Sequence, residues 1–326
     1  MVDIYSPSGK EKEISDYLRG YLKRHGLAVA IQPVDDHRNN LIVAPEDTDL
    51  QVAFIGHLDT ISAPDLKTYG YQEYGDRIQG LGTADMKGGC AAMIEAFLSF
   101  KESGGENAAA ALCLVVGEEE TGDGTRQLIR EYRFPWAVIG EPTDLVPCFG
   151  SYGYLEVFVE TKGRRMHPSV AEGRDNAIEV LLQVMLGITH YLDQQGPQVI
   201  YNIRDLSSSR GGFVVPERCE AWLDLHLQPI APLRDILGEL ENICLQKATG
   251  NQDIDIEFGV CTLEGGYEIT DSGPVPTALE AVYNRLGLYW APALFRSHSD
   301  ANQLWSAGVK PRSEERRVGK ECATGC

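Results

Sequence analysis

Residues 51–60 read QVAFIGHLDT and residues 80–89 read GLGTADMKGG, and these two stretches decide the fold. In the first, a short apolar run ends at a glycine and is followed directly by His57, which is typical of a buried strand with a polar residue at its carboxyl end. In the second, a glycine-rich loop carries Asp85 and leads into a helix predicted over residues 88–103. Together they predict an α/β unit with its chemistry at the strand ends.

The same arrangement occurs twice more along the chain. An apolar run at residues 109–116 precedes the glutamates of residues 118–120, and another at residues 136–139 precedes Glu141. Strands that alternate with helices favour a mostly parallel sheet covered by helices on both faces. Because the carboxyl ends of parallel strands meet at one edge of such a sheet, we expect these polar side chains to gather there.

The N-terminal segment predicts a helix with a defined start. Ser8 precedes Glu11 by three residues, which is the spacing of a capping box. Apolar residues then recur at helical period, at Ile14, Leu18 and Leu22. We therefore expect a helix that begins with Ser8 as its cap.

The pattern changes near residue 151, where alternating apolar and polar residues replace the buried runs. From there the sequence predicts strands at 154–161, 198–203, 212–215, 218–227 and 253–260, and helices at 176–192 and 232–248. Such a composition of elements is typical of an α+β unit. We interpret residues 151–264 as a second domain, inserted into a first domain that comprises residues 1–150 and 265–311.

The composition limits the classes of protein that fit this chain. With 326 residues, 43% of them hydrophobic, it is long enough for two packed domains. A net charge of −19 argues against nucleic acid as a partner, because phosphates require a basic surface. No run of eighteen apolar residues is present, so we expect no membrane partner. The lack of a signal sequence and the eight scattered cysteines favour the cytoplasm.

One imidazole and several carboxylates at one sheet edge are suitable ligands for zinc, cobalt or manganese. Two ions about 3.5–4 Å apart need a carboxylate that bridges them, and Asp85 in its glycine-rich loop suits that task. Asp59 lies two residues after His57, so in an extended chain both side chains point the same way and the carboxylate can fix the imidazole. Hydrolysis also needs a base that is not a ligand, and adjacent glutamates offer one side chain for each task.

Five motifs give the sequence its resemblance to a known family: HLDT at 57–60, GLGTADMKGG at 80–89, EEETG at 118–122, GEPTD at 140–144 and SDAN at 299–302. In their order and spacing over nearly the whole chain, they resemble the motifs of the M20 family of metallopeptidases and N-acyl-amino-acid deacylases. The resemblance implies an α/β fold: a mostly parallel-sheet zinc-peptidase catalytic domain with an inserted α+β lid or dimerisation domain.

The same resemblance implies a role for each matching residue. The implied roles are ligands of one ion for His57 and Glu141, a bridge between two ions for Asp85, a ligand of the second ion for Glu120, the general base for Glu119, and orientation of His57 for Asp59. The family's Asp-Glu-Glu has Glu118 in place of the aspartate in this chain. A cis peptide bond between Asp85 and Met86 is implied as well.

In the inserted domain, His167 in the stretch KGRRMHPS resembles the family's lid histidine. In the family that residue approaches the scissile carbonyl, often from the partner subunit. The resemblance therefore implies a homodimer formed through the inserted domain and a catalytic role for His167 at the oxyanion. Two substrate-holding positions depart from the family, with Phe213 for an asparagine and His226 for an arginine. Arg210 lies nearby in the sequence, and we expect it to contact the substrate instead.

The C-terminal end departs from the family too. No histidine follows His298, so the second metal site lacks the C-terminal histidine that the family supplies. Residues 312–326, RSEERRVGKECATGC, resemble the translation of a sequencing adapter, and we expect them to be an artefactual tail. We also expect this chain to be poorly stable and nearly inactive, and its full-length parent to be active.

The expected function is metal-dependent hydrolysis of an amide, in which a water activated by two ions releases the acyl group of a small N-acyl amino acid. Two alternatives stay open. One is a dipeptidase or carboxypeptidase of the same family acting on short peptides, and the other is a non-catalytic homologue that uses the inserted domain for dimerisation or ligand binding. A serine hydrolase is disfavoured, because no GxSxG motif follows a predicted strand.

Overall fold

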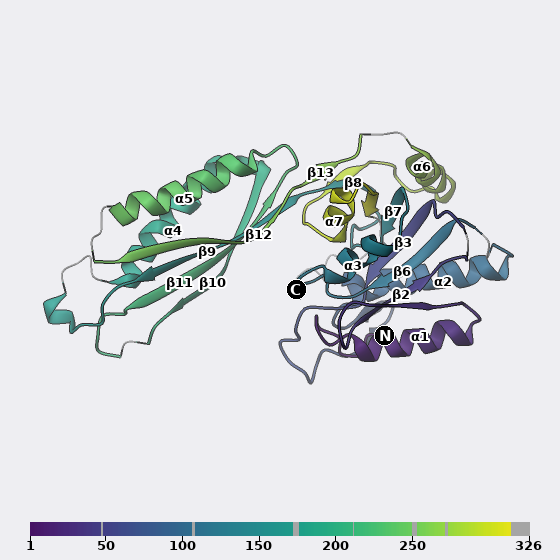
Figure 1. Cartoon of the computed structure of the whole chain (residues 1–326), viewed down its shortest axis with the longest axis horizontal. Helices are drawn as coiled ribbons and strands as arrows, with labels where there is room; N and C mark the ends of the chain where they lie inside the picture. Colours follow the sequence, from purple (N-terminus) through teal and green to yellow (C-terminus); the bar gives the residue numbers. More distant parts are fainter. Residues whose placement is uncertain are drawn as a thin grey trace. The chain divides into compact units, whose positions relative to one another are not determined.

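The computed structural model describes residues 1–46, 48–105, 108–171, 176–210, 212–249, 253–270 and 273–313. The chain forms two compact units, both drawn in Figure 1. Unit 1 comprises Met1–Gly150, Glu268–Phe295 and the residues from Ser299 onward, and unit 2 comprises Ser151–Tyr267 with Arg296–His298. Apart from its first two residues, the expected artefactual tail lies outside the described residues.

Unit 1 is built on a sheet whose centre is parallel. Strand β3 (Val52–His57) pairs in parallel with β6 (Ala110–Val115) and with β7 (Trp136–Ile139), and β7 pairs in parallel with β15 (Lys310–Ser313). The register sets His57 beside Val115, so the residues that follow β3 and β6 emerge at the same edge. The predicted α/β class with a mostly parallel central sheet is confirmed.

Antiparallel strands flank this centre. Strands β1 (Ala30–Pro33) and β2 (Asn39–Val43) extend the sheet beyond β6, while β8 (Cys148–Ser151), β13 (Tyr267–Glu268) and β14 (Ala293–Phe295) lie beyond β15. A separate hairpin is formed by β4 (Gln72–Tyr74) and β5 (Arg77–Gln79).

The helices of unit 1 in the described part of the chain are α1 (Lys12–Arg24), α2 (Gly88–Glu102), α3 (Asp123–Glu131), α6 (Pro274–Leu286) and α7 (Asp300–Ser306). Helix α1 buries Ile14 and Leu18 in one cluster with Ile94 of α2 and Leu112 of β6. Each such side chain removed from water stabilises the fold by about 1.5–3 kcal/mol. No described helix is both long and apolar enough to cross a membrane.

The predicted helix after Ser8 exists, but its predicted cap is wrong. Helix α1 begins at Lys12 with Glu11 at the N-cap position, and no side chain caps its first turn. The Ser8 hydroxyl instead donates a hydrogen bond to the carboxylate of Asp59, 51 residues away. A tertiary contact has therefore replaced the local capping box.

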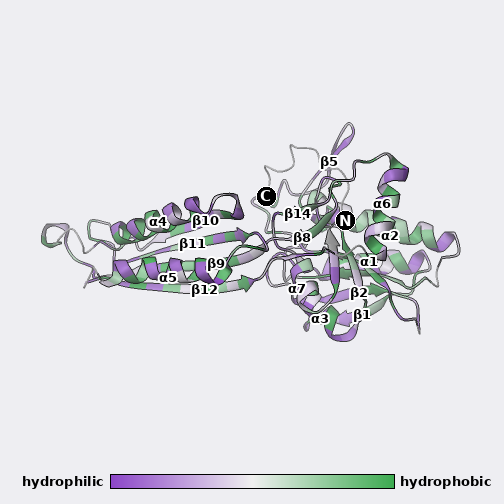
Figure 2. Cartoon of the chain, turned by 90° about the horizontal axis from the view of Figure 1, so that it is seen from above, coloured by the Kyte–Doolittle hydropathy of each residue, from purple (hydrophilic) through white to green (hydrophobic). Residues whose placement is uncertain are grey.

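Unit 2 is an antiparallel four-stranded sheet with two helices. Its strands follow the order β10 (Val199–Ser208), β11 (Arg218–Leu227), β9 (Gly153–Lys162) and β12 (Asp255–Glu264). Helices α4 (Ala177–Gln194) and α5 (Leu233–Thr249) pack their apolar residues on the sheet, and Figure 2 shows hydrophobic and hydrophilic residues interleaved along both helices. Short 3-10 turns, η2 (Pro168–Val170) and η3 (Gly196–Gln198), flank α4.

One strand predicted in this unit is wrong. Residues 212–214 form bends and Val215 has no regular structure, so no strand forms there. The apolar pattern that suggested a strand is not buried as a whole, because Phe213 is 95% exposed whereas Val215 is 7% exposed. An apolar run alone does not distinguish a strand from a loop that presents its side chains outward.

Candidate metal centre

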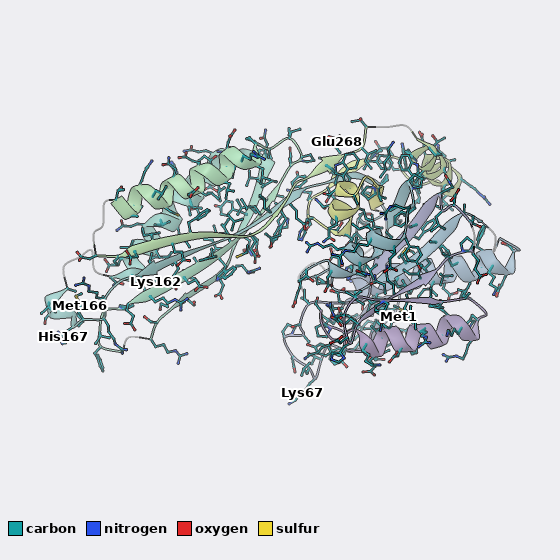
Figure 3. All side chains as sticks on the ribbon, in the orientation of Figure 1. Met1, Lys67, Lys162, Met166, His167 and Glu268 are labelled. Atoms are coloured by element: carbon teal, nitrogen blue, oxygen red, sulfur yellow. The ribbon has the colours of Figure 1, made fainter. Side chains whose placement is uncertain are left out.

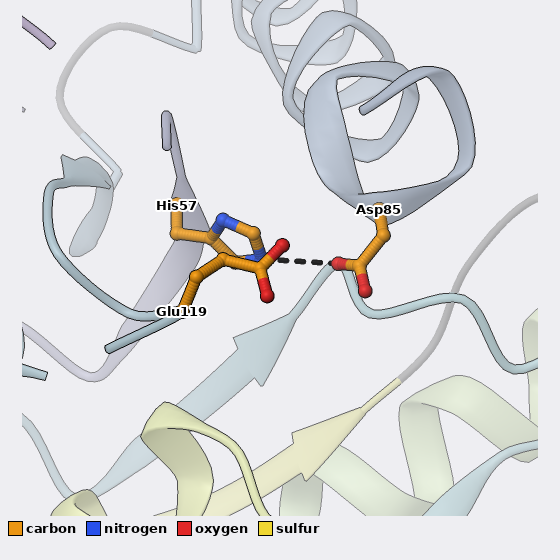
Figure 4. Close-up of side chains that lie close together, drawn as sticks. All are labelled: His57, Asp85 and Glu119. Atoms are coloured by element: carbon orange, nitrogen blue, oxygen red, sulfur yellow. Dashed lines mark hydrogen bonds and ion pairs between the residues drawn. The ribbon is translucent and has the colours of Figure 1, made fainter. Parts of the chain in front are cut away.

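His57 is the last residue of β3 and is buried, with 1% of its surface exposed. Its Nδ1 atom lies 3.0 Å from the backbone oxygen of Asp59, which favours the tautomer with the proton on Nδ1. Its Nε2 atom lies 3.1 Å from Oδ1 of Asp85, as Figure 4 shows. The contact at Nδ1 therefore leaves Nε2 free to face the carboxylates.

Asp85 is held in a tight turn, Thr83–Lys87 (η1), between Gly82 and helix α2. Gly82 has a φ of +70°, and a Cβ atom there would lie 2.4 Å from the Cγ2 atom of Thr60. Only glycine permits this approach of the turn to the segment after β3. The peptide bond between Asp85 and Met86 is cis, which confirms the prediction.

Three glutamates complete the cluster. Oε2 of Glu118 and Oε1 of Glu141 lie 3.8 Å and 3.9 Å from Nε2 of His57. A carboxylate oxygen of Glu119 lies within 4.8 Å of the ligand atoms of His57 and Asp85 (Figure 4). Two sets of three potential ligands in the described part of the chain thus share His57, one with Asp85 and Glu119 and the other with Glu118 and Glu141.

Glu120, the expected ligand of the second ion, belongs to neither set. Its side chain is exposed and lines a separate surface pocket of about 500 Å³. The physical reason is a tight turn after β6, in which the N–H of Gly122 donates to the carbonyl oxygen of Gly117 at 2.6 Å. This turn directs Glu118 and Glu119 inward and Glu120 outward. The sequence pattern had given Glu118 no role, because a run of three glutamates contains no signal for which two face the site.

Asp59 connects the histidine to the glutamates. Its side chain is fully buried, and its Oδ1 and Oδ2 atoms accept hydrogen bonds from the backbone N–H groups of Glu118 at 3.1 Å and Glu119 at 3.0 Å. Its Oδ1 atom also lies 3.5 Å from Nδ1 of His57. Burial alone would raise the pKa of Asp59, but the neighbouring His57 and hydrogen bonds from Ser8 and Glu119 hold it below the usual value.

Several carboxylates share this buried cluster with one imidazole. Burial and the neighbouring carboxylates raise the pKa values of Glu118 and Glu141 well above normal and that of Glu119 to about 7. Burial opposes a charge on His57, yet Asp59, Asp85 and Glu118 together raise its pKa well above normal.

The donors fit a divalent cation. They combine one imidazole nitrogen with several carboxylates, the ligand chemistry that zinc and related ions prefer. Oε1 of Glu141 is buried and has no hydrogen-bond partner among the described residues, although a buried carboxylate oxygen normally has one. A cation at this position would both satisfy that oxygen and remove the repulsion between the carboxylates.

Asp300 is a further neighbour of the cluster to which the sequence pattern gave no role. It is the first residue of α7 and is 2% exposed. Its charge contributes to the raised pKa values of Glu118 and Glu141, so it lies close to both. The motif SDAN contains the residue, but no feature of the motif distinguishes a helix-capping aspartate from one that faces a site.

The remaining predicted site residues belong to unit 2. His167 is exposed, and its Nδ1 atom accepts a hydrogen bond from the backbone N–H of Ser169 at 3.2 Å, so that it caps η2. Figure 3 shows it beside Met166, past the end of β9. Arg210 is exposed in the segment after β10. The roles implied for both residues stay predictions.

Comparison with known proteins extends the resemblance over most of the chain. A peptidase M20 domain-containing protein of Schizosaccharomyces pombe is 30% identical over 252 residues, which cover 74% of this chain and 62% of that protein. A protein of Staphylococcus epidermidis named as a probable succinyl-diaminopimelate desuccinylase is 27% identical over 191 residues, or 56% of this chain and 47% of that protein. The chain thus spans about half to two thirds of the length of these relatives.

The fold has a close structural counterpart. The crystal structure of a tripeptidase of Staphylococcus aureus superposes with a TM-score of 0.83 at 18% identity, covering 98% of this chain and 88% of that one. Residues 53–310 match the family described as peptidase family M20/M25/M40. This match includes β3 apart from its first residue, the strands β6 and β7, and every carboxylate of the cluster around His57. The chain therefore belongs to peptidase family M20/M25/M40.

Proposed function

We propose that this chain is a metal-dependent amidohydrolase that releases the acyl group from a small N-acyl amino acid. The observation that carries the proposal is the buried cluster in which His57 meets four carboxylates at the edge of a parallel sheet. Membership of a peptidase family supports cleavage of a C–N bond, and the donor set supports a metal-assisted reaction.

Two divalent ions, zinc or else cobalt or manganese, are part of the proposal. His57, Asp85 and Glu141 would hold one ion, and Asp85 and Glu119 would hold the second. When bound, the ions supply a positive charge that polarises the amide carbonyl and lowers the pKa of a water molecule. Asp59 would orient His57 and keep the two inward glutamates in place through their backbone N–H groups.

We assign the general base to Glu118. The family resemblance implies a base followed directly by a ligand, and the match to the motif EEETG placed them at Glu119 and Glu120. Because the turn after β6 directs Glu118 and Glu119 inward, we assign the base to Glu118 and the ligand to Glu119, each one residue earlier in the chain. Glu118 would accept a proton from the attacking water and return it to the nitrogen of the leaving amine, so that the amide bond breaks without a free amide anion.

The name of the Staphylococcus epidermidis relative supports an N-acyl amino acid as the substrate. The likeness in fold to the tripeptidase of Staphylococcus aureus favours a second candidate, a peptidase acting on short peptides. A homodimer formed through unit 2, a catalytic role for His167 at the oxyanion and substrate contact by Arg210 belong to the proposal with either substrate.

The test is hydrolysis by the full-length parent, in which we expect activity, after treatment with a chelator and restoration of zinc. N-acetyl and N-succinyl amino acids are compared with dipeptides and tripeptides, with released amine as the readout. Glu118→Gln should lower turnover at least about 100-fold with zinc content unchanged, whereas the matched change Glu120→Gln, on an exposed side chain, should leave it nearly unaffected. Turnover by Glu118→Gln at the wild-type rate would remove Glu118 from the mechanism. Zinc binding without hydrolysis of any of these substrates would favour the non-catalytic homologue.

A further inference from the structure

The N-terminal segment of residues 4–8 lies against the loops that carry the metal-facing side chains. Ser6 exchanges two hydrogen bonds with the segment after β3, because its Oγ atom donates to the carbonyl oxygen of Leu58 at 2.9 Å and its own carbonyl accepts from the N–H of Thr60 at 3.0 Å. Pro7 forms a parallel bridge with Thr60 in addition. The segment therefore follows the loop that contains His57 and Asp59 in register.

The same segment also contacts the turn that holds Asp85. Lys87 is 2% exposed, and its Nζ atom donates a hydrogen bond to the carbonyl oxygen of Ile4 at 2.8 Å. A buried ammonium group loses its hydration, so this bond to a fixed backbone oxygen is a specific anchor between the turn and the N-terminal segment.

Ser8 makes the direct connection to the metal centre. Its Oγ atom donates to Oδ2 of Asp59 at 2.6 Å, and it is the only side-chain hydroxyl within the described residues that bonds this carboxylate. The other donors to Asp59 are the backbone N–H groups of Glu118 and Glu119. The buried carboxylate of Asp59 therefore accepts hydrogen bonds from the Ser8 hydroxyl and from the backbone N–H groups of both inward glutamates. It also lies 3.5 Å from Nδ1 of His57.

We infer that Ser8 is a positioning residue of the metal centre, which acts through Asp59 to fix His57 and the Glu118–Glu119 backbone together. The inference rests on the proposed function only in requiring that the cluster binds a metal. The hydroxyl is not needed for the helix that follows, because α1 starts at Lys12 without a side-chain cap. It makes a short, charge-assisted bond to a fully buried carboxylate, which is where such a bond fixes geometry most strongly.

Removing the hydroxyl leaves Oδ2 of Asp59 with one donor fewer and lets the carboxylate rotate. Groups that orient metal ligands without touching the metal change metal affinity by about 10–100-fold when they are removed. We expect Ser8→Ala to weaken metal binding by about 10-fold, and Ser8→Thr, which keeps the hydroxyl, to restore most of the affinity.

The experiment is a titration of the chelator-treated full chain with Co²⁺ alone, followed by its visible absorption bands, which report ligand geometry as well as affinity. Ser103→Ala is the matched control, since the Ser103 hydroxyl is exposed and bonds only the carbonyl oxygen of Phe100 among the described residues. The melting temperature of each metal-free variant is measured alongside. No substrate is required, so loss of the proposed hydrolysis does not affect the outcome.

Weaker Co²⁺ binding and altered bands in Ser8→Ala, with a metal-free melting temperature like that of Ser103→Ala and rescue by Ser8→Thr, support the inference. Unchanged Co²⁺ affinity in Ser8→Ala overturns it. A lower melting temperature of metal-free Ser8→Ala that accounts for the affinity loss, or no rescue by Ser8→Thr, also overturns it, because Ser8 would then serve the fold in general.

Discussion

The three consecutive glutamates after β6 have three different surroundings although their side chains are chemically identical. Glu118 is close to His57 and Glu141, Glu119 is close to His57 and Asp85, and Glu120 faces solvent. Burial and repulsion raise the pKa values of the first two, and Asp59 holds their backbone. Their different surroundings therefore follow from the turn that separates inward from outward positions.

A pair of variants tests this division. Glu119→Gln should weaken binding of Zn²⁺ by at least about 100-fold for one ion, because a neutral amide is a poor ligand and the loss of a direct ligand exceeds that of an orienting group. Glu120→Gln should bind Zn²⁺ as the wild type does. Zinc content after dialysis measures both. If Glu119→Gln kept two ions and lost only turnover, the base would be Glu119 rather than Glu118.

Much of the cluster was predictable residue by residue from the sequence. His57, Glu119 and Glu141 follow apolar runs that became parallel strands, and the register of those strands brings the residues to one edge. That Glu118 lies in the cluster while Glu120 is exposed was not predictable, because it depends on a backbone turn that begins at Gly117. The contact between Ser8 and Asp59 was also not predictable, since it joins residues 51 positions apart and competes with a local capping box.

At the scale of elements, the junction of β6 with α3 fixes where the glutamates lie. Asn40 of β2 is fully buried, and its Oδ1 atom accepts from the N–H of Val116 at 3.2 Å while its Nδ2 atom donates to the carbonyl oxygen of Gly124 at 2.8 Å. One side chain thus joins the end of the strand to the start of the helix on either side of the glutamate turn.

Asn40→Ala should lower the free energy of unfolding of unit 1 by about 3 kcal/mol, because it removes the partner of the buried N–H of Val116 and of the buried amide oxygen of Gln32, at about 1–3 kcal/mol each. Urea unfolding measures the loss. The control is Asn202→Ala, on an exposed residue of β10. Equal stability of the two variants would show that Asn40 does not hold this junction.

In unit 2, an aromatic cluster predicts acid sensitivity. The ring of His298 stacks on Tyr154 with centroids 4.1 Å apart, and burial together with His226 lowers the pKa of His298 to about 4 from 6.5. The unfolded chain takes up this proton near pH 6.5 and the folded chain only near pH 4. The stability that the neutral ring provides above a pH of about 6.5 is therefore lost as the pH falls toward about 4.

His298→Phe keeps an aromatic ring on Tyr154 and removes the proton site. Between about pH 7.5 and about pH 4.5 the variant should lose less stability than the wild type, by up to about 3 kcal/mol. Urea unfolding midpoints at both pH values measure the difference, with His190→Phe, at an exposed position of α4, as the control. Parallel losses in wild type and His298→Phe would contradict a buried neutral His298.

Hydropathy periodicity predicted most elements in both units, because long amphipathic helices and buried strands carry repeating signals. The strands β3, β6 and β7 and the helices α4 and α5 lie close to their predicted ranges. The strand expected at 212–215 failed because its apolar residues include the exposed Phe213, and periodicity does not report exposure.

At the scale of the whole molecule, the chain interrupts one α/β unit with a second unit of different architecture. The change from buried runs to alternating strands near residue 151 carries that information in the sequence. The homodimer, the cytoplasmic location and the identity of the metal stay predictions, because they depend on molecules outside this chain.

The central claim is that the cluster around His57 binds a divalent metal through carboxylates of unit 1. The most direct measurement is calorimetric titration of the chelator-treated protein with Zn²⁺, for the wild type and for Asp85→Asn, which keeps the size of the shared ligand and removes its charge. We predict saturable binding by the wild type and an affinity at least about 100-fold lower for Asp85→Asn. Absence of binding by the wild type, or identical isotherms for the two proteins, would contradict the claim.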